Sequence, residues 1–466
     1  MRVGCQRQRM ILVALAVFLQ GAEGAGPSLV EAARNGNSQV LSLLLRKQAP
    51  VNAADGDGST ALLWVCYRDE VESARLLIAA GADVNAANDL GATPLWAASQ
   101  NGSDGMVRLL LEAGAKPDAA LQSGETPLMV AARSGYPSVV EQLAAKGANV
   151  NARASRGQTA LMWAVAQKHP EVVKVLLAHG ADLQARSTTW SEVMAVPPHG
   201  FLEYNRAIPH GNDSALLFAA RVGDLASAKL LVAGGASVND TDASGISATT
   251  LAAFSGNGDV VEYLLDQGAD ASAGGAGFTA LHAAILHREE KAVRALLDHG
   301  ADANAPLRTW TPTRRSSHDF NFAPEWVGAT PFWLAARVAE PGIMRLLLKH
   351  GADPMFVHHG DHVVTVKSGS DPFQHRKDVT TALMAATGMG GGRAWIPLAQ
   401  SAAEERTLEA VKLLLDLGVD LNAANTDGRN ALDGARSLGY QSVIKFLVEK
   451  GAKSDRPVKK VTIEEK

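Results

Sequence analysis

The sequence predicts an all-α repeat solenoid, in which helix pairs are stacked in a row with short β-hairpins between them. One observation is a segment that recurs every 33 residues along the first half of the chain. Another is a pair of columns, one of alanine and one of leucine, that align through the copies. Self-similarity at such a period indicates a repeat architecture. Eleven copies begin at Pro27, Thr60, Thr93, Thr126, Thr159, Ser214, Ser247, Thr279, Thr330, Thr381 and Asn430.

The first helix of each copy is predicted from its start and from a small residue within it. Thr93-Pro94 and Thr126-Pro127 supply a capping hydroxyl followed by proline at the first helical position. Five residues into ten of the eleven copies there is an alanine, which lets this helix approach its partner closely; Val65 is the exception. The alanines are Ala32, Ala98, Ala131, Ala164, Ala219, Ala252, Ala284, Ala335, Ala386 and Ala435.

The second helix is predicted from a leucine column and from the glycine that follows it. Leucines seventeen residues into the copies, with apolar neighbours at helical spacing, form the buried face. They are Leu44, Leu77, Leu110, Leu143, Leu176, Leu231, Leu264, Leu296 and Leu347, joined by Leu414 and Leu447 once an insertion in the tenth copy is allowed for. Glycine, as at Gly81, accepts the left-handed conformation that ends a helix. A turn such as Asn88-Asp89-Leu90-Gly91 then leads to the next copy.

The combination of Thr-Pro-Leu, Leu-Leu and Gly-Ala-Asp-Val-Asn in a 33-residue frame resembles the ankyrin-repeat family over nearly all of residues 27–455. The resemblance implies a curved helix-turn-helix stack with short β-hairpin fingers and a concave surface that usually binds other proteins. The expected repeat domain spans residues 25–455. Its first and last copies depart from the pattern, as terminal caps do because their outer faces meet water.

The first 24 residues are predicted to be a secretory signal peptide. Arg2, Arg7 and Arg9 precede an apolar run from Met10 to Leu19, and small residues follow before Ala25. Removing this segment leaves Cys66 as the one cysteine, so no disulfide can form within the chain. We therefore expect a periplasmic protein of a Gram-negative bacterium, with secretion as the alternative. Residues 456–466 are predicted to be a solvated, charged tail.

The composition favours a protein partner over nucleic acid. The net charge is −4, and Lys and Arg are not gathered into a long run. No segment after the signal is long and apolar enough to be predicted as a membrane span. We expect a monomer that binds one or more proteins and needs no cofactor.

The 33-residue spacing is interrupted by four insertions, near 186–212, 306–328, 355–379 and 388–405. The first three fall at the finger position, and the fourth falls between the two helices of the tenth copy. Insertions in a solenoid map to loops on one face, which is often the binding face. The second and third insertions flank one repeat, so we expect them to form one composite wall beside the concave groove. The first lies three repeats away, at roughly 30 Å.

The insertions are rich in aromatic residues and histidine, and aromatic residues and arginine commonly anchor interfaces. The alternative interpretation is that these aromatics fold the loops back onto the solenoid and close small satellite cores. The candidate protein-binding residues, which include one tryptophan on a neighbouring first helix, are Trp190, Tyr204, Trp310, Arg314, Arg315, Phe320, Trp326, Trp333, His358, Asp361 and His362.

No segment of the sequence predicts catalysis. The cluster from His358 to His362 contains metal-ligand types, but Gly360 and the following valines favour turn and strand over a shared helical face, so we interpret it as a solvated polar loop. The glycines from Gly388 to Gly392 lack the strand and lysine of a phosphate-binding loop and are interpreted as a linker. Cys66 is expected to be a buried apolar thiol. A non-catalytic binding scaffold is therefore predicted. The alternatives are a metal-dependent small-molecule site or enzyme built by the insertions, and a secreted effector that binds host proteins.

Overall fold

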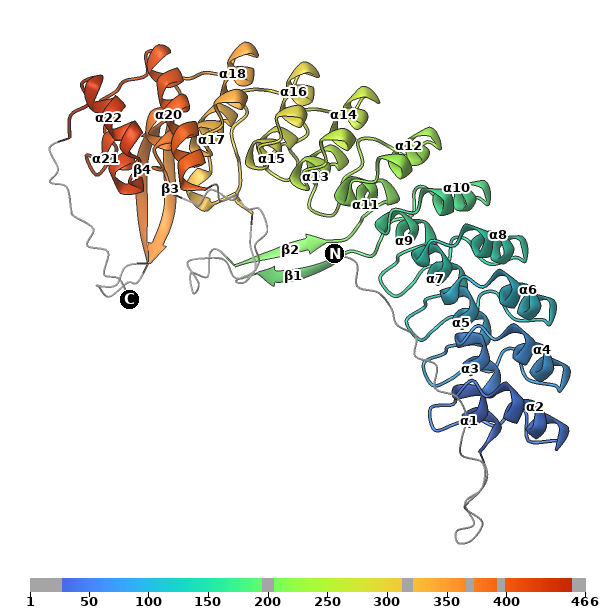
Figure 1. Ribbon diagram of the computed structural model, residues 1–466. Helices are drawn as coiled ribbons and strands as arrows, with labels where there is room; N and C mark the ends of the chain where they lie inside the picture. The colour runs from blue at the N-terminus through green and yellow to red at the C-terminus, as the bar shows by residue number, and fades with distance from the viewer. Residues whose placement is uncertain (1–26, 195–204, 312–321, 366–372, 392–398, 455–466) are drawn as a thin grey trace, which may run out of the picture.

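The described residues form one curved row of eleven helix pairs (Figure 1). This computed structural model describes residues 27–194, 205–311, 322–365, 373–391 and 399–454. The first helix of each pair lies on the concave side of the arc and the second lies on the convex side. The predicted helical solenoid is therefore confirmed. The predicted signal peptide and the charged tail lie outside the described residues.

The concave side is formed by the odd-numbered helices. They are α1 (Leu29–Arg34), α3 (Ala61–Tyr67), α5 (Pro94–Asn101), α7 (Pro127–Ser134), α9 (Ala160–Ala166), α11 (Ala215–Val222), α13 (Ala248–Phe254), α15 (Ala280–Leu286), α17 (Pro331–Arg337), α19 (Ala382–Ala386) and α21 (Ala431–Leu438). Each one contacts the next odd-numbered helix along the row.

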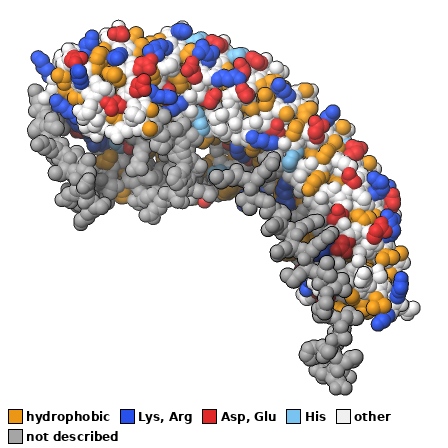
Figure 2. Space-filling model, in the orientation of Figure 1, with side chains coloured by type: hydrophobic (Ala, Val, Ile, Leu, Met, Phe, Trp, Pro, Cys, Tyr) orange, Lys and Arg blue, Asp and Glu red, His pale blue; other side chains and the backbone are white. Residues whose placement is uncertain are grey.

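The convex side is formed by the even-numbered helices. They are α2 (Ser38–Arg46), α4 (Val71–Ala79), α6 (Asp104–Glu112), α8 (Pro137–Ala145), α10 (Pro170–Ala178), α12 (Leu225–Ala233), α14 (Gly258–Asp266), α16 (Glu290–Asp298), α18 (Pro341–Lys349), α20 (Gln400–Asp416) and α22 (Gln441–Glu449). Figure 2 shows basic and acidic side chains interspersed along this side. None of the helices in the described ranges combines the length and apolar composition that a bilayer crossing requires.

The concave helices begin where the sequence predicts because a Ser or Thr hydroxyl caps most of their starts, and the side-chain oxygen of Asn430 caps α21. The side chains of Thr93 and Thr126 accept hydrogen bonds from the backbone N–H groups of Trp96 and Met129, and proline follows each threonine. These bonds satisfy donors that the first turn of a helix leaves unpaired. The convex helices end at residues with positive φ, such as Gly81 at 88°, and Gln48 takes that place in the first copy at 56°.

The two predicted columns form a continuous core. Every alanine of the first column, and Val65, is at most 3% exposed. The leucines from Leu77 to Leu447 are fully buried, and only Leu44 in the terminal copy is partly exposed. One apolar cluster extends from Leu29 to Ala452, so the repeats share a core instead of forming separate domains.

Neighbouring copies are also joined through the turns that precede the concave helices, which we call fingers. The backbone N–H of Asp89 donates to the carbonyl of Asp57 in the previous finger, at 2.9 Å, and Thr188 donates to Arg156 at 2.8 Å. Most fingers are tight turns; outside the named strands, the described residues form β-bridges only at Ala54–Thr60 and Thr241–Ser247. The larger hairpins come from the insertions.

The first and third insertions form antiparallel two-stranded hairpins that project from the concave side (Figure 1). Strands β1 (Trp190–Met194) and β2 (Arg206–His210) pair with Trp190 opposite His210. Strands β3 (Val357–Thr365) and β4 (Phe373–Thr381) pair with Val357 opposite Thr381. The second insertion contains a short 3-10 helix, η2 (Pro324–Trp326). The fourth lies between α19 and α20 as predicted, and α20 is 17 residues long.

We expect Leu176→Ala to lower the free energy of unfolding by roughly 2–5 kcal/mol, because the fully buried leucine leaves a cavity between neighbouring repeats. The measurement is urea unfolding followed by circular dichroism. Leu90→Ala is the control, since Leu90 is 67% exposed in a finger and its loss is expected to change stability by less than about 0.5 kcal/mol. Equal unfolding midpoints for the two variants would contradict the shared core.

Stability should also depend on pH through His282 in α15. This side chain is fully buried; its Nδ1 accepts from the Thr279 backbone N–H at 3.1 Å, and its Nε2 lies 3.0 Å from the Ala305 carbonyl. Burial lowers the pKa of His282 from 6.5 to about 4. Between these values the unfolded chain binds more protons than the folded chain, so stability falls as the pH falls through this window.

For His282 alone the expected loss between pH 7 and pH 4 is about 3 kcal/mol, at 1.36 kcal/mol per unit of pKa difference. Unfolding experiments at a series of pH values should therefore give a shallower dependence for His282→Gln than for the parent. Leu90→Ala, which changes no titratable group, should keep the parental slope. An unchanged slope in the His282 variant would show that this imidazole is not the group responsible.

Candidate functional site

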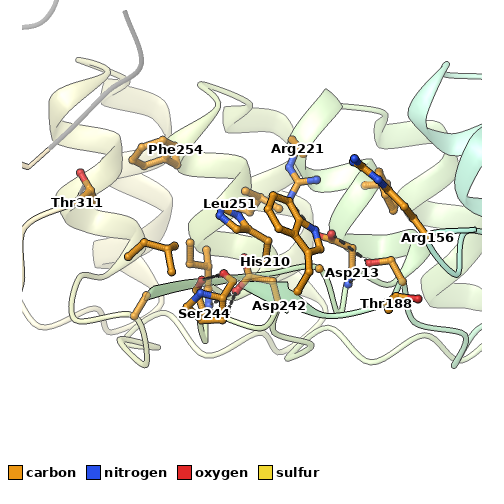
Figure 3. A pocket seen from close by; sticks show the side chains of 18 of the residues that line it. Arg156, Thr188, His210, Asp213, Arg221, Asp242, Ser244, Leu251, Phe254 and Thr311 are labelled. Carbon is orange, nitrogen blue, oxygen red and sulfur yellow. Dashed lines mark hydrogen bonds and ion pairs between the residues drawn. The ribbon is translucent and has the colours of Figure 1, made fainter. Parts of the chain in front are cut away.

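A cavity of about 730 Å³ lies on the concave side, between hairpin β1–β2 and the concave helices α11 and α13. Figure 3 shows residues of the hairpin, the fingers and the helices turned toward this space. The start of the second insertion, at Thr309–Thr311, completes the lining. The first and second insertions, which the sequence placed three repeats apart, therefore border one cavity.

One end of the cavity is an aromatic stack with a cation above it. The rings of Trp190 and His210 are stacked across the hairpin, with centroids 4.4 Å apart and planes 23° from parallel. The guanidinium of Arg156, in the finger before α9, lies 5.9 Å from the Trp190 ring centroid. This distance falls within the range of a cation–π interaction. The stack holds the arginine at the cavity edge.

The floor beside this stack is polar and connects the hairpin to the solenoid. Arg221 of α11 forms a 2.9 Å ion pair with Asp213, whose backbone N–H donates to the Ser187 hydroxyl. Asp242 accepts hydrogen bonds from the backbone N–H groups of Ser244 and Ile246 in its own finger. Burial raises the pKa of Asp242 above its usual range. These contacts fix the entry and exit of the hairpin.

The other end of the cavity is apolar. Phe254 at the end of α13 lies beside Phe278, with ring centroids 6.0 Å apart, and Phe278 in turn lies 4.9 Å from Phe322 of the second insertion. Leu251 and Trp310 also line this end. The Phe322 ring packs edge-on against His282, so the second insertion is joined to the core at its base.

A second cluster joins the second, third and fourth insertions around α17. The Trp326 indole N–H donates to the carbonyl of Gly391 at 3.1 Å, and Nη2 of Arg337 donates to the same carbonyl at 2.9 Å. The second and third insertions are neighbours, as predicted: His358 in β3 lies 3.0 Å from the Val327 carbonyl. The linker interpretation is wrong for residues 388–391, because these contacts hold the glycine segment against α17.

The predicted site residues fall into four groups. Trp190, which is 42% exposed, and Trp310 line the cavity. Trp326, Trp333, His358 and His362 are 0–9% exposed and pack the insertions onto the solenoid. Asp361 is exposed and pairs with His375 at 3.2 Å. The remaining candidates, Tyr204, Arg314, Arg315 and Phe320, lie outside the described residues.

The histidine cluster is not a solvated loop. His358 and His362 lie in strand β3 and are buried, and the ring of His358 contacts Trp333 with centroids 4.7 Å apart. Burial lowers the pKa of both imidazoles. Among the described residues, no group of three or more His, Cys, Asp or Glu side chains is placed to hold a metal ion. Cys66 is fully buried, and burial raises the pKa of its thiol.

Sequence reasoning missed the apolar end of the cavity and also missed Arg221 on its polar floor. Phe254 and Phe278 belong to ordinary repeats, in which an apolar residue is expected to pack in the core. A signal exists in the column just before the capping residue. Glu125, Gln158 and Asp213 occupy it in three copies, whereas Ile246 and Phe278 occupy it in the seventh and eighth copies, which border the cavity.

Comparison with known families matches most of the chain to ankyrin repeats. A model of three consecutive ankyrin repeats matches residues 29–121, 117–187, 216–306 and 357–457, and a single-repeat model matches residues 327–359. The unmatched stretches, 188–215 and 307–326, contain hairpin β1–β2 and Thr309–Thr311. The cavity is thus bounded by repeat residues on one side and by unmatched insertions on the other.

Among solved structures, the chain is similar to the ankyrin repeat domain of human ASB11. The two are 29% identical with a TM-score of 0.40, over 48% of this chain and 90% of that one. No curated protein matches the chain.

Proposed function

Because the chain belongs to the ankyrin-repeat family, whose members typically act as non-catalytic interaction scaffolds, we propose that it is an exported scaffold that binds a protein partner on its concave side. The observation that carries the proposal is the cavity between hairpin β1–β2 and the concave helices. It combines exposed aromatic surface with an arginine, which are the residue types that dominate protein interfaces.

The shape of the cavity favours a polypeptide over a compact small molecule. Its lining residues come from five successive fingers, those that precede α9, α11, α13, α15 and α17. At roughly 8–10 Å per repeat, this row extends over about 30–40 Å. An extended chain of about ten residues has that length. A long slot across several repeats therefore suits a segment of another protein.

The cavity is also prepared for binding before a partner arrives. Finger-to-finger hydrogen bonds join Thr188 to Arg156 on one side of the hairpin and Ala243 to Gly211 on the other, at 2.8 and 2.9 Å. The hairpin base is closed by the hydrogen bond from the Asn212 backbone N–H to the Ser187 carbonyl. A rigid binding surface loses little conformational entropy when it binds, which increases affinity.

Export is the second part of the proposal, and it rests on the basic and apolar segment that ends before Ala25. Expression of the full chain in a Gram-negative host should give a mature protein that begins at or near Ala25, because signal peptidase cleaves after small residues. Intact-mass measurement of periplasmic and cytoplasmic fractions checks this. Replacement of the apolar run by polar residues is the control, and it should leave the full-length chain in the cytoplasm. If the parent is found only in the cytoplasmic fraction and keeps its full N-terminus, the export proposal is contradicted.

Replacing residues 190–210 by Asn-Gly should abolish partner binding and leave the fold intact. Thr189 and Gly211 would then flank a two-residue turn, a length typical of tight hairpins, and the finger ladder through Thr188 and Gly211 would remain. The parent and the variant are used as baits in the native envelope fraction, and captured proteins are identified by mass spectrometry. Melting temperatures establish that both baits are folded.

Val193→Ala is the matched control for this experiment. Val193 lies on β1 and is 71% exposed, and it does not line the cavity. We expect it to capture the same partner as the parent. A partner that the hairpin replacement captures as well as the parent does would place the binding surface elsewhere and reject the proposal.

A further inference from the structure

Among the described residues, an arginine guanidinium lies over a tryptophan ring at four places. Arg337 over Trp326 belongs to the cluster around α17, and the other three lie between the first and sixth copies. Arg34 lies over Trp64 at 5.1 Å, Arg133 lies over Trp163 at 4.7 Å, and Arg156 lies over Trp190 at 5.9 Å. The first two arginines are also paired with a carboxylate of the chain. Arg34 pairs with Asp55, and Arg133 pairs with Glu125 at 2.8 Å. The chain thus builds the same three-part arrangement of cation, indole and carboxylate twice.

The third arrangement lacks its carboxylate. In the described part of the chain no aspartate or glutamate side chain forms an ion pair with Arg156, although Asp213 and Asp240 nearby pair with Arg221 and Arg186. Arg156 is also the arginine of the three that borders the large cavity. A carboxylate supplied from outside would complete the arrangement, and a guanidinium binds it through two parallel hydrogen bonds.

Within the part of the chain that the structure describes, the cavity wall near Arg156 contains a second polar group without a hydrogen-bond partner, on His210. Nε2 of His210 is buried in the cavity wall and has no hydrogen-bond partner among the described residues. Buried polar atoms are nearly always paired in folded proteins, so this nitrogen is suited to a group that a ligand brings. The stacking of His210 on Trp190 fixes the position of the imidazole relative to Arg156.

The apolar end of the cavity sets the second requirement for a ligand. Phe254 and Phe278 lie two to three repeats along the row from the finger of Arg156, and Leu251 and Trp310 line the space beside them. At roughly 10 Å per repeat, the separation is about 20–30 Å. An extended chain covers it in about six to nine residues.

We propose that the partner presents an extended acidic segment to this cavity. Its aspartate or glutamate carboxylate pairs with Arg156 over Trp190, and an aromatic or large aliphatic side chain about six to nine residues away packs between Phe254, Phe278 and Trp310. A backbone group of the segment pairs with His210. This inference rests on the proposed function and specifies the chemistry of the partner, which the repeat family leaves open.

Three pools of synthetic fluorescent peptides, each about twelve residues long, test the proposal with the full mature protein. In the acidic pool, one fixed glutamate and one fixed phenylalanine are about seven residues apart, in both orders, and the other positions are degenerate. The basic pool has lysine in place of the glutamate. The third pool keeps the glutamate and has alanine in place of the phenylalanine. Fluorescence anisotropy gives the apparent affinities.

The acidic pool should bind the parent at least about tenfold more tightly than either other pool, because charge-assisted pairing and aromatic burial each contribute. Arg156→Gln should weaken acidic-pool binding by about tenfold and remove the preference over the basic pool. Trp190→Ala should have a similar effect, since it removes the surface that orients the arginine. Arg75→Gln, on the convex helix α4, and Val193→Ala should retain the parental preference.

Equal binding of the acidic and basic pools to the parent overturns the proposal, and so does the absence of acidic-pool binding at millimolar protein. A preference that survives Arg156→Gln overturns it as well. If the parent sediments as a dimer that Arg156→Gln dissociates, the occupant is a second copy of this chain and the proposal is wrong. The hairpin replacement separates the two levels. The scaffold function stands and only the acidic chemistry fails if two results are found together. The hairpin replacement abolishes capture of the native partner, and the acidic and basic pools bind the parent with equal affinity.

Discussion

The packing of each concave helix against the next is the interaction on which the rest of the structure depends. A helix such as α9 has seven residues and is far too short to be stable alone. It persists because Ala164 and its counterparts let adjacent helices approach closely, and because Leu176 and its counterparts cover the apolar face behind them. The apolar cluster is continuous from the first copy to the last, so no pair of helices has to bury its own surface.

The same constraint explains how the chain carries large insertions without losing its fold. The first insertion leaves the finger ladder at Thr188 and returns to it at Gly211, whose φ of 84° lets the chain pass close to the carbonyl of Thr188. The second insertion is closed in the same way, since Thr311 donates to the Phe322 carbonyl at 3.1 Å and Gly328 donates to Leu307 at 2.7 Å. The third is closed by the pairing of Val357 with Thr381, so at these three insertions the repeats on either side stack as they would without them.

This separation between repeat and insertion also sets what could be predicted from sequence. The repeat columns follow from local periodicity, and the burial of Leu110 or Ala131 was predictable because the same environment recurs in each copy. The fate of His358 was not predictable. Its burial depends on Trp333 and on the Val327 carbonyl, which approach it only after the insertions fold against α17. Counting repeats predicted that the second and third insertions are neighbours. It did not predict that the first and second insertions border one cavity. That cavity depends on how far the β1–β2 hairpin extends along the groove.

On the concave side, an arginine stacked on a tryptophan occurs both with and without a carboxylate partner. Where Asp55 and Glu125 accompany Arg34 and Arg133, the cation is neutralised within the chain and the surface is locally complete. Arg156 has the indole and lacks the carboxylate, yet its charge needs little compensation because the cavity is open to water and an exposed ion pair contributes only about 0–1 kcal/mol to stability. The scaffold therefore tolerates the missing partner at almost no loss of stability. The same arginine gains far more when an extended chain covers it and excludes water, because electrostatic attraction strengthens as the local dielectric falls. The unpaired arginine therefore costs the free protein little stability and contributes to the free energy of binding when a partner covers it. Such a site is suited to reversible binding.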